Sequence, residues 1–193
     1  MVDGFMLAAL PRALGAEARR ASEGLAPPRH SAGDRLIQDS NERRWGQVIV
    51  GGNELRIPYR HYQDPASPVA DPDAELVRQA WLTRSSHGQV RQQAVQSLLR
   101  APAFWHVPYV LQLCGEYVIE IGQDIAEYTA GPLERDPLML EAYRRFWRDN
   151  PAFVALTYAR AASYWNAYYR RTLTLTEYPP HAAVVQVEAL VRS

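Results

Sequence analysis

The chain contains no lysine: all 21 of its lysine-or-arginine residues are arginines. Lysine is normally one of the commonest residues, so its absence excludes several classes of chemistry. A Schiff base, a pyridoxal phosphate anchor and the phosphate-binding lysine of a P-loop or a kinase all require a lysine amine. A GC-rich genome that favours arginine codons is the simpler cause, and selection against lysine-directed tagging is the alternative.

Cysteine is almost absent as well, because Cys114 is the only one in 193 residues. A single cysteine excludes an internal disulfide and any multi-cysteine metal site. The formal net charge is zero, so no overall field attracts nucleic acid or a membrane. No apolar run approaches the roughly 18 residues that span a bilayer, and the apolar segment 4–10 lacks the basic residues of a signal peptide. We therefore expect a cytoplasmic protein without membrane association.

The pattern of apolar residues predicts a mainly α fold: a packed helical domain of about five to six helices, with a small β-hairpin near the N-terminal side. Residues 1–43 are expected to be a poorly defined N-terminal segment, with an alanine-rich stretch over 12–23 that favours a helix. The helical domain is expected over 44–193. It includes a hairpin over 46–60, where apolar and polar residues alternate on both sides of turn residues at 51–53.

Three dipeptides indicate helix starts, namely Asp71-Pro72, Asp136-Pro137 and Asn150-Pro151. The side-chain oxygen of Asp or Asn caps a free backbone N–H, and proline at the first helical position loses no hydrogen bond. Ser86 and Gln89 also suggest a capping box. Leu173 and Leu175 alternate with threonines, which suggests a third strand. The predicted helices cover 72–84, 87–100, 105–129, 137–149, 151–171 and a short stretch after Pro180.

Residues 73–100 resemble a single HEAT-type helical unit. They form a short helix, a tight turn and a second helix that opens with Gln89-Val90-Arg91, where such units carry a valine–arginine pair. The resemblance implies stacking of a helix pair. It covers under a sixth of the chain, and no second copy follows at a spacing near 40 residues, although such architectures need at least three.

Four carboxylates fall on one face of the predicted helix over 105–129. At about 100° per residue, they lie within roughly 80° of one another. Such a stack could hold a divalent cation or act as acid and base, so Glu116 and Glu120 are candidate site residues. No histidine accompanies them at metal-ligand spacing, so no metal or cofactor is expected, and a solvated face is the simpler interpretation. The four are Glu116, Glu120, Asp124 and Glu127.

Aromatic and arginine residues alternate in the C-terminal part of the chain. Nine aromatics lie between positions 143 and 171, and seven arginines against three acidic residues lie between 135 and 171. Arginine and aromatic residues dominate protein-binding hot spots, and they also stack on nucleic-acid bases. A thick helical core is the simpler interpretation. The candidate binding residues of this block are Arg144, Arg148, Trp165 and Tyr169.

A third candidate is the turn before the helix predicted over 87–100. Arg84, His87 and Arg91 surround a helix N-terminus, whose free amides favour a phosphate or carboxylate. Plain helix capping is the alternative. Cys114 lies on an apolar stripe, which predicts a buried, inert thiol.

No catalytic motif accompanies these residues, so the sequence favours a non-enzymatic protein that binds another protein. A nucleic-acid-binding accessory protein is the first alternative. The second is an enzyme of unrecognised type, in which Glu116 or Glu120 and His87 or Arg91 share a pocket. The sequence leaves the oligomeric state open.

Overall fold

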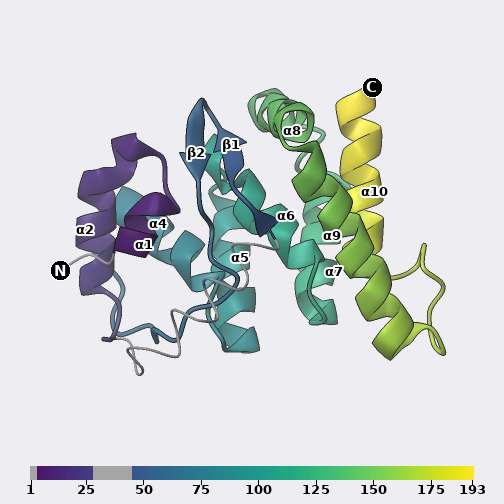
Figure 1. The fold of residues 1–193 in the computed structure, drawn as a ribbon, viewed down its shortest axis with the longest axis horizontal. Coiled ribbons are helices and arrows are strands. Elements are labelled where there is room, and N and C mark those ends of the chain that lie inside the picture. The colour runs from purple at the N-terminus through teal and green to yellow at the C-terminus, as the bar shows by residue number, and fades with distance from the viewer. Residues whose placement is uncertain (1–3, 28–44) are drawn as a thin grey trace. The chain divides into compact units, whose positions relative to one another are not determined.

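The computed structural model describes residues 4–27 and 45–193, and these residues are mainly helical with one two-stranded sheet, as the sequence predicts (Figure 1). The internal contacts divide the chain into two compact units, Met1–Ala101 and Pro102–Ser193, called unit 1 and unit 2. The predicted boundary after residue 43 lies outside the described residues.

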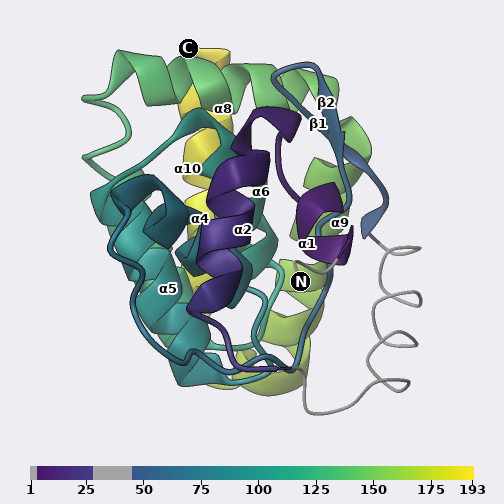
Figure 2. The same cartoon turned by 90° about the vertical axis from the view of Figure 1, so that its left-hand side faces the viewer.

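Unit 1 contains four described helices, one 3-10 turn and the hairpin. Its elements are α1 (Gly4–Ala8), η1 (Arg12–Leu14), α2 (Gly15–Glu23), β1 (Val48–Val50), β2 (Asn53–Leu55), α4 (Pro72–Leu82) and α5 (Gly88–Arg100). Helix α2 packs on α4, and α4 packs on α5; Figure 2 shows α2 in front of α4. The predicted helix over 12–23 is therefore present as η1 and α2.

The hairpin has the register Val48↔Leu55 and Val50↔Asn53, joined by a two-residue turn. Gly51 and Gly52 both have positive φ, of 55° and 77°, which is the conformation that a turn of this length requires. The ladder is shorter than the predicted 46–60. It ends at Leu55 because the next residue, Arg56, donates its backbone N–H to Ala8 of α1 at 2.8 Å.

Unit 2 consists of helices with short connections. Its elements are η2 (Phe104–His106), α6 (Val107–Cys114), α7 (Ile119–Thr129), α8 (Pro137–Asp149), α9 (Pro151–Tyr164), the π-helical turn η3 (Trp165–Tyr169) and α10 (Pro179–Arg192). Every residue of α6 is buried, and α10 packs against α6, α7, α8 and α9. The two helices α7 and α10 approach closely at Gly122, where Pro180 of α10 occupies the space that a Cβ would need.

All three predicted Asx-Pro helix starts are present, but only two of them are capped as expected. The Oδ1 atom of Asp71 accepts hydrogen bonds from the backbone N–H groups of the second and third residues of α4, both at 3.0 Å. The Oδ1 atom of Asp136 does the same for α8, at 3.1 and 3.0 Å. Asn150 makes no such bond to α9. Its Nδ2 donates instead to the carbonyl oxygen of Phe146 at 2.9 Å, so it closes the end of α8.

The predicted continuous helix over 105–129 is wrong. The structure has two helices, α6 and α7, separated at residues 115–118. Side chains from distant segments bond to the carbonyl groups in this break: Arg160 Nε donates to Gly115 at 3.1 Å, and the Tyr178 hydroxyl donates to Glu116 at 3.2 Å. These bonds satisfy carbonyls that would otherwise be left without a partner where the helix stops.

The predicted helix over 151–171 changes its hydrogen-bond pattern after Tyr164. The backbone N–H of Arg170 bonds to the carbonyl of Trp165 at 2.9 Å, five residues back, which defines the π-helical turn. The indole N–H of Trp165 donates to the carbonyl of Leu173 at 2.8 Å and fixes the chain as it leaves this turn.

The predicted strand at Leu173 and Leu175 is wrong, because these residues lie in turns. The carboxylate of Glu177 accepts bonds from the backbone N–H and the hydroxyl of Thr174, at 2.8 and 2.7 Å. This local bonding satisfies groups that a strand would present to a partner. The helix predicted after Pro180 is present as α10, which begins one residue earlier, at Pro179.

Candidate functional site

The arginines predicted to bind an anion in unit 1 are enclosed by protein. Arg84 is 0% exposed and Arg91 is 1% exposed. Arg91 Nη1 donates to the carbonyls of Ser85 and Ser86 at 2.9 and 3.1 Å, so it holds the turn before α5. The planar guanidinium suits this role because it can bond to two carbonyls at once. Arg91 therefore stabilises the turn before α5.

His87 lies apart from these buried groups. It is the N-cap residue of α5 but makes no side-chain cap, and the predicted capping box of Ser86 and Gln89 is absent. Its exposed ring lies 3.5 Å, measured from Nε2, from a carboxylate oxygen of Asp64. The turn thus separates the predicted anion-binding residues into a buried pair and one exposed histidine.

A histidine that the sequence did not single out lies beside this turn. His61 stacks on Trp81 with ring centres 4.8 Å apart. Its Nε2 is 2.7 Å from the Trp81 carbonyl, and its Nδ1 accepts the backbone N–H of Gln63 at 3.2 Å. Burial lowers the pKa of His61 to about 4, and the charges of nearby Arg84 and Arg60 add to the effect. Both ring nitrogens are occupied, so this neutral imidazole supports the fold and has no nitrogen available for a metal or a proton transfer.

The predicted stack of four carboxylates does not form on one helix. Glu116 lies in the break between α6 and α7 and is 1% exposed, whereas Glu120 and Glu127 are exposed on α7 and Asp124 is half-buried there. Within residues 4–27 and 45–193, no three His, Cys, Asp or Glu side chains gather closely enough to hold a metal ion. The acidic face that remains on α7 is a surface feature.

The aromatic and arginine block divides into two separate regions. Arg144 Nη2 lies 3.5 Å from the carbonyl of Leu190, and Arg148 pairs with Asp149 at 2.9 Å, both on α8. Trp165 and Tyr169 lie in η3, beyond the far end of α9. Helix α9 has 14 residues, which at about 1.5 Å per residue places roughly 21 Å between its ends. The four candidate residues therefore do not form one site.

The region around η3 contains a group of mutually packed tyrosines, which we call the tyrosine cluster: Tyr117, Tyr164, Tyr168 and Tyr169. The ring centre of Tyr117 lies 5.9 Å from that of Tyr164 and 6.2 Å from that of Tyr168. The ring centres of Tyr164 and Tyr168 are 6.1 Å apart, and these two rings are nearly parallel. The Tyr169 hydroxyl donates to the carbonyl of Tyr117 at 3.0 Å. These contacts join the α6–α7 break to the end of α9.

The cluster rests on the protein interior and faces outward at two positions. Tyr169 stacks on the buried ring of Tyr178 at 5.1 Å. Tyr117 is 49% exposed and Tyr168 is 66% exposed, and both are among the most exposed large aromatic residues in the described part of the chain. The Arg160 guanidinium lies 5.5 Å from the centre of the Tyr164 ring, which adds a cation–π contact. The result is a fixed aromatic surface with open ring area.

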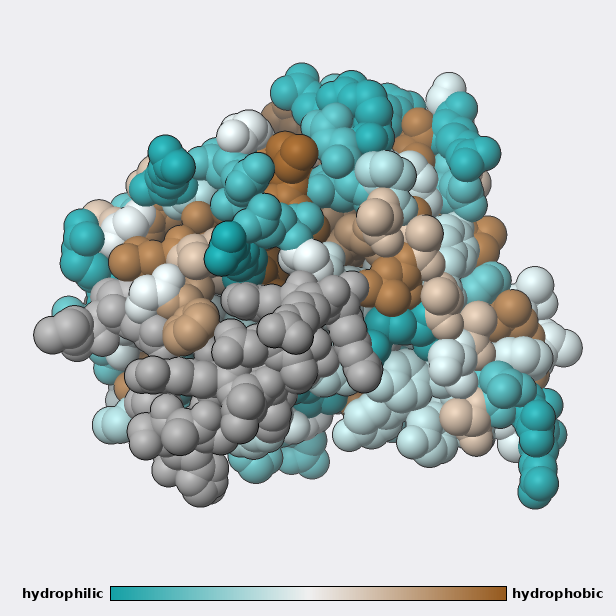
Figure 3. Space-filling view, in the orientation of Figure 1, coloured by the Kyte–Doolittle hydropathy of each residue, from teal (hydrophilic) through white to brown (hydrophobic). Residues whose placement is uncertain are grey.

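Charged residues of both signs occur near the tyrosine cluster. Arg170 and Arg171 are exposed directly after η3, and the stretch 151–176 contains no acidic residue. Glu120 of α7 is close enough to Tyr169 to raise the pKa of its hydroxyl further, beyond the rise that burial causes. In Figure 3, strongly hydrophilic atoms and pale atoms of weakly polar residues occur together at this end of unit 2.

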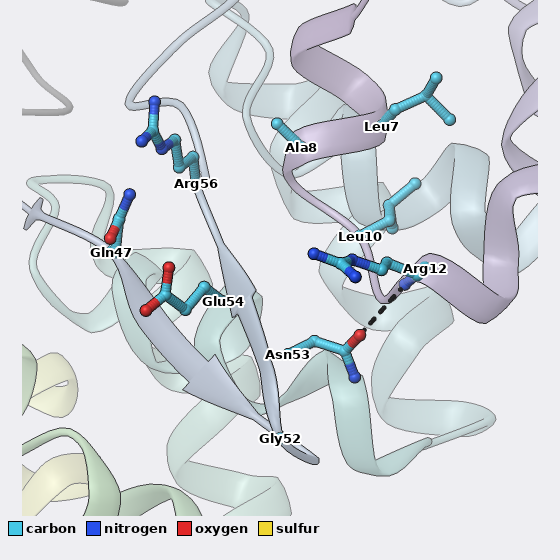
Figure 4. Close-up of a pocket in the computed structure, with 9 residues that line it drawn as sticks. All are labelled: Leu7, Ala8, Leu10, Arg12, Gln47, Gly52, Asn53, Glu54 and Arg56. Atoms are coloured by element: carbon cyan, nitrogen blue, oxygen red, sulfur yellow. Dashed lines mark hydrogen bonds between the residues drawn. The ribbon is translucent and has the colours of Figure 1, made fainter.

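Unit 1 has a groove between its N-terminal helices and the hairpin, with a volume of about 540 Å³ (Figure 4). Leu7 and Leu10 form its apolar side, and Arg12 reaches toward β2, where its backbone N–H bonds to Asn53 Oδ1 at 3.4 Å. The opposite wall is polar and carries Gln47, Glu54 and Arg56. Ligand pockets are usually lined by apolar groups, which this open groove has on one side only.

Cys114 is fully buried in α6, as the sequence predicts. Burial raises the pKa of its thiol to about 12, and the nearby carboxylate of Glu116 adds to the effect. A thiol with so high a pKa has almost no thiolate at neutral pH, so it is inert as a nucleophile.

No protein-family model matches the chain, and neither a curated protein nor a solved structure does so. The resemblance of residues 73–100 to a HEAT-type unit thus remains a prediction, although α4 and α5 do pack as a helix pair. Among the described residues, no helix combines the length and apolar character needed to cross a membrane.

Proposed function

We propose that this chain is a non-enzymatic, cytoplasmic protein that binds another protein through the tyrosine cluster of unit 2. The observation that supports this proposal most is the exposure of Tyr117 and Tyr168 on a packed base. Tyrosine and arginine are enriched in binding hot spots. Tyrosine in particular offers a large contact area with few rotatable bonds. Rings that are already held in place lose little further freedom on binding.

Site-specific photo-cross-linking tests the proposal. A benzophenone amino acid replaces Tyr168, and the protein is irradiated in a lysate of its source cell. We expect a discrete cross-linked protein that is missing when Tyr117 is also changed to Ala. The matched control carries the same group at Leu138, which is 84% exposed at the start of α8. Equal labelling from both positions contradicts the proposal.

The second candidate function is binding of single-stranded nucleic acid by the same surface. It is favoured by Arg170 and Arg171 beside stacked tyrosines, because bases can stack on the rings while the guanidinium groups contact phosphates. Such binding weakens steeply with salt, whereas an aromatic protein contact responds much less. Titration of a labelled 12-nucleotide oligothymidylate at 50 and 200 mM salt distinguishes the two. Tight, salt-sensitive binding that requires Tyr168 favours nucleic acid.

A further inference from the structure

The two outward-facing rings of the tyrosine cluster are the two most exposed tyrosines of the chain, and they are neighbours. All eleven tyrosines lie in the described residues, and only Tyr168, at 66%, and Tyr117, at 49%, are exposed. Their ring centres are 6.2 Å apart, with the ring planes at 45° to each other. A reagent in solvent therefore reaches these two adjacent phenols more readily than any other.

The other side chains that lose an electron readily are shielded in the described part of the chain. Cys114, the only cysteine, is fully buried, and Met6 and Met139 are buried as well. All five tryptophans are buried or half-buried. A one-electron oxidant that acts from solvent is thus directed to Tyr117 and Tyr168.

The hydroxyl groups of these two rings are open to water. Arg160 donates to the hydroxyl of Tyr164 at 3.2 Å, and the hydroxyl of Tyr169 donates to the carbonyl of Tyr117 at 3.0 Å. No protein group among the described residues bonds to the hydroxyl of Tyr117 or Tyr168 in this way. A phenol that loses an electron also loses its hydroxyl proton, and at these two rings water can accept that proton directly.

We propose that Tyr117 and Tyr168 form an oxidative cross-linking site, at which a one-electron oxidant joins the two rings as a dityrosine. Each phenol gives up one electron and its hydroxyl proton, which leaves two neutral tyrosyl radicals. A carbon–carbon bond forms between the two rings, at a carbon next to the one that bears the oxygen in each. These two carbons then pass their hydrogens to the oxygens of their own rings, which restores both phenols. When a haem peroxidase is the oxidant, the two electrons and two protons reduce one hydrogen peroxide to two waters.

The geometry favours this pair over the other pairs of the cluster. Both side chains are exposed, and exposed side chains change rotamer within picoseconds to nanoseconds, so the two rings approach each other repeatedly. The rings of Tyr164 and Tyr168 are stacked at 19°, so they present their faces to each other rather than the edges that must bond. The bond forms within one chain and needs no binding partner, so this site is independent of the function proposed above.

Oxidation of the full chain by a haem peroxidase and hydrogen peroxide tests the site. Dityrosine fluorescence is measured in the monomer fraction after gel filtration of dilute protein. Trypsin cleaves this lysine-free chain only after arginine, so Tyr117 lies in peptide 101–135 and Tyr168 in peptide 161–170. We expect these two peptides as one linked product, whose mass is their sum less two hydrogen atoms. Fragmentation should assign the link to Tyr117 and Tyr168.

Tyr117→Phe and Tyr168→Phe test each ring separately, because phenylalanine keeps the ring but has no phenol. We expect the linked product to disappear in each variant. The matched control Tyr62→Phe changes a half-buried tyrosine and should leave the yield unchanged. The link should also raise the Tm of the wild-type monomer, measured by circular dichroism, because it closes a loop and restricts the unfolded chain. Neither variant should show this rise after the same treatment.

Several results overturn the proposal. They are a wild-type monomer without the link, a link that persists in either phenylalanine variant, and a main product that joins other tyrosines, such as Tyr164 and Tyr168 within peptide 161–170. Protein unfolded in urea is oxidised in parallel and should give a mixture of links. An equal yield of the link between Tyr117 and Tyr168 from the unfolded chain overturns the proposal too, because the fold is then not what brings the two rings together.

Discussion

Replacing Gly122 with alanine should destabilise the protein, although alanine is the better helix former. Gly122 lies within α7 opposite the start of α10. An added Cβ would lie 2.7 Å from the backbone nitrogen of Pro180 and closer still to its ring carbons. These atoms belong to a rigid ring and to the backbone, so the new methyl group requires a shift of a whole helix end rather than a side-chain rotation.

The magnitude follows from two opposing terms. Alanine gains about 1 kcal/mol over glycine inside a helix. Overpacking of a close contact costs about 1–3 kcal/mol, and the upper part of this range, about 2–3 kcal/mol, applies here because the contact involves atoms that cannot turn away. We expect a net loss of about 1–2 kcal/mol in the free energy of unfolding, and a larger loss for Gly122→Val. For a chain of this size each kcal/mol lowers Tm by about 2–4 °C.

Thermal unfolding followed by circular dichroism measures the effect, with Gly15→Ala as the matched control. Gly15 begins α2, and an added Cβ there meets nothing within 4 Å. The control should therefore keep or slightly raise Tm, so the two identical substitutions should have opposite signs. If Gly122→Ala raises Tm as the control does, α7 and α10 do not approach each other as closely as the structure shows.

Three further predictions concern single groups. Because burial lowers the pKa of His61 to about 4 and of His106 to about 3, the unfolded chain binds more protons below pH 6.5. Stability measured by urea unfolding should fall by roughly 1.4 kcal/mol per pH unit for each histidine between pH 6.5 and 4, and His61→Gln should remove about half of that slope. Asp136→Asn should keep the helix cap and leave Tm unchanged, because asparagine caps a helix as well as aspartate does. Asn150→Asp should lower the free energy of unfolding by about 1–3 kcal/mol, because it places a buried acceptor against the carbonyl oxygen of Phe146. Equal changes in Tm for the two substitutions would contradict these roles. Cys114 should react with a thiol reagent at pH 8 only after denaturation, and rapid labelling of the native protein would show that it is accessible.

Features fixed by neighbouring residues could be predicted from the sequence, and features fixed by distant ones could not. The helix starts at Pro72 and Pro137 depend on a cap one residue away, so their dipeptides are sufficient. The break between α6 and α7 depends on Arg160 and Tyr178, which are 45 and 62 residues away from their acceptors. The aromatic content of residues 143–171 predicted a binding surface there. Tyr117 lies outside that block, and it belongs to the tyrosine cluster only because the helix breaks beside it.

Arginine serves two different purposes in this chain, and only the structure separates them. With no lysine present, arginine supplies both the enclosed groups that bind backbone carbonyls and the solvated charges of the surface. Arg91 belongs to the first kind, since its guanidinium bonds to two carbonyls and is 1% exposed. Arg170 and Arg171 belong to the second kind. Composition alone does not distinguish the two kinds of arginine, whereas burial does. Burial favours the exposed arginines beside the tyrosine cluster, rather than the enclosed ones at the turn before α5, as residues that contact a partner.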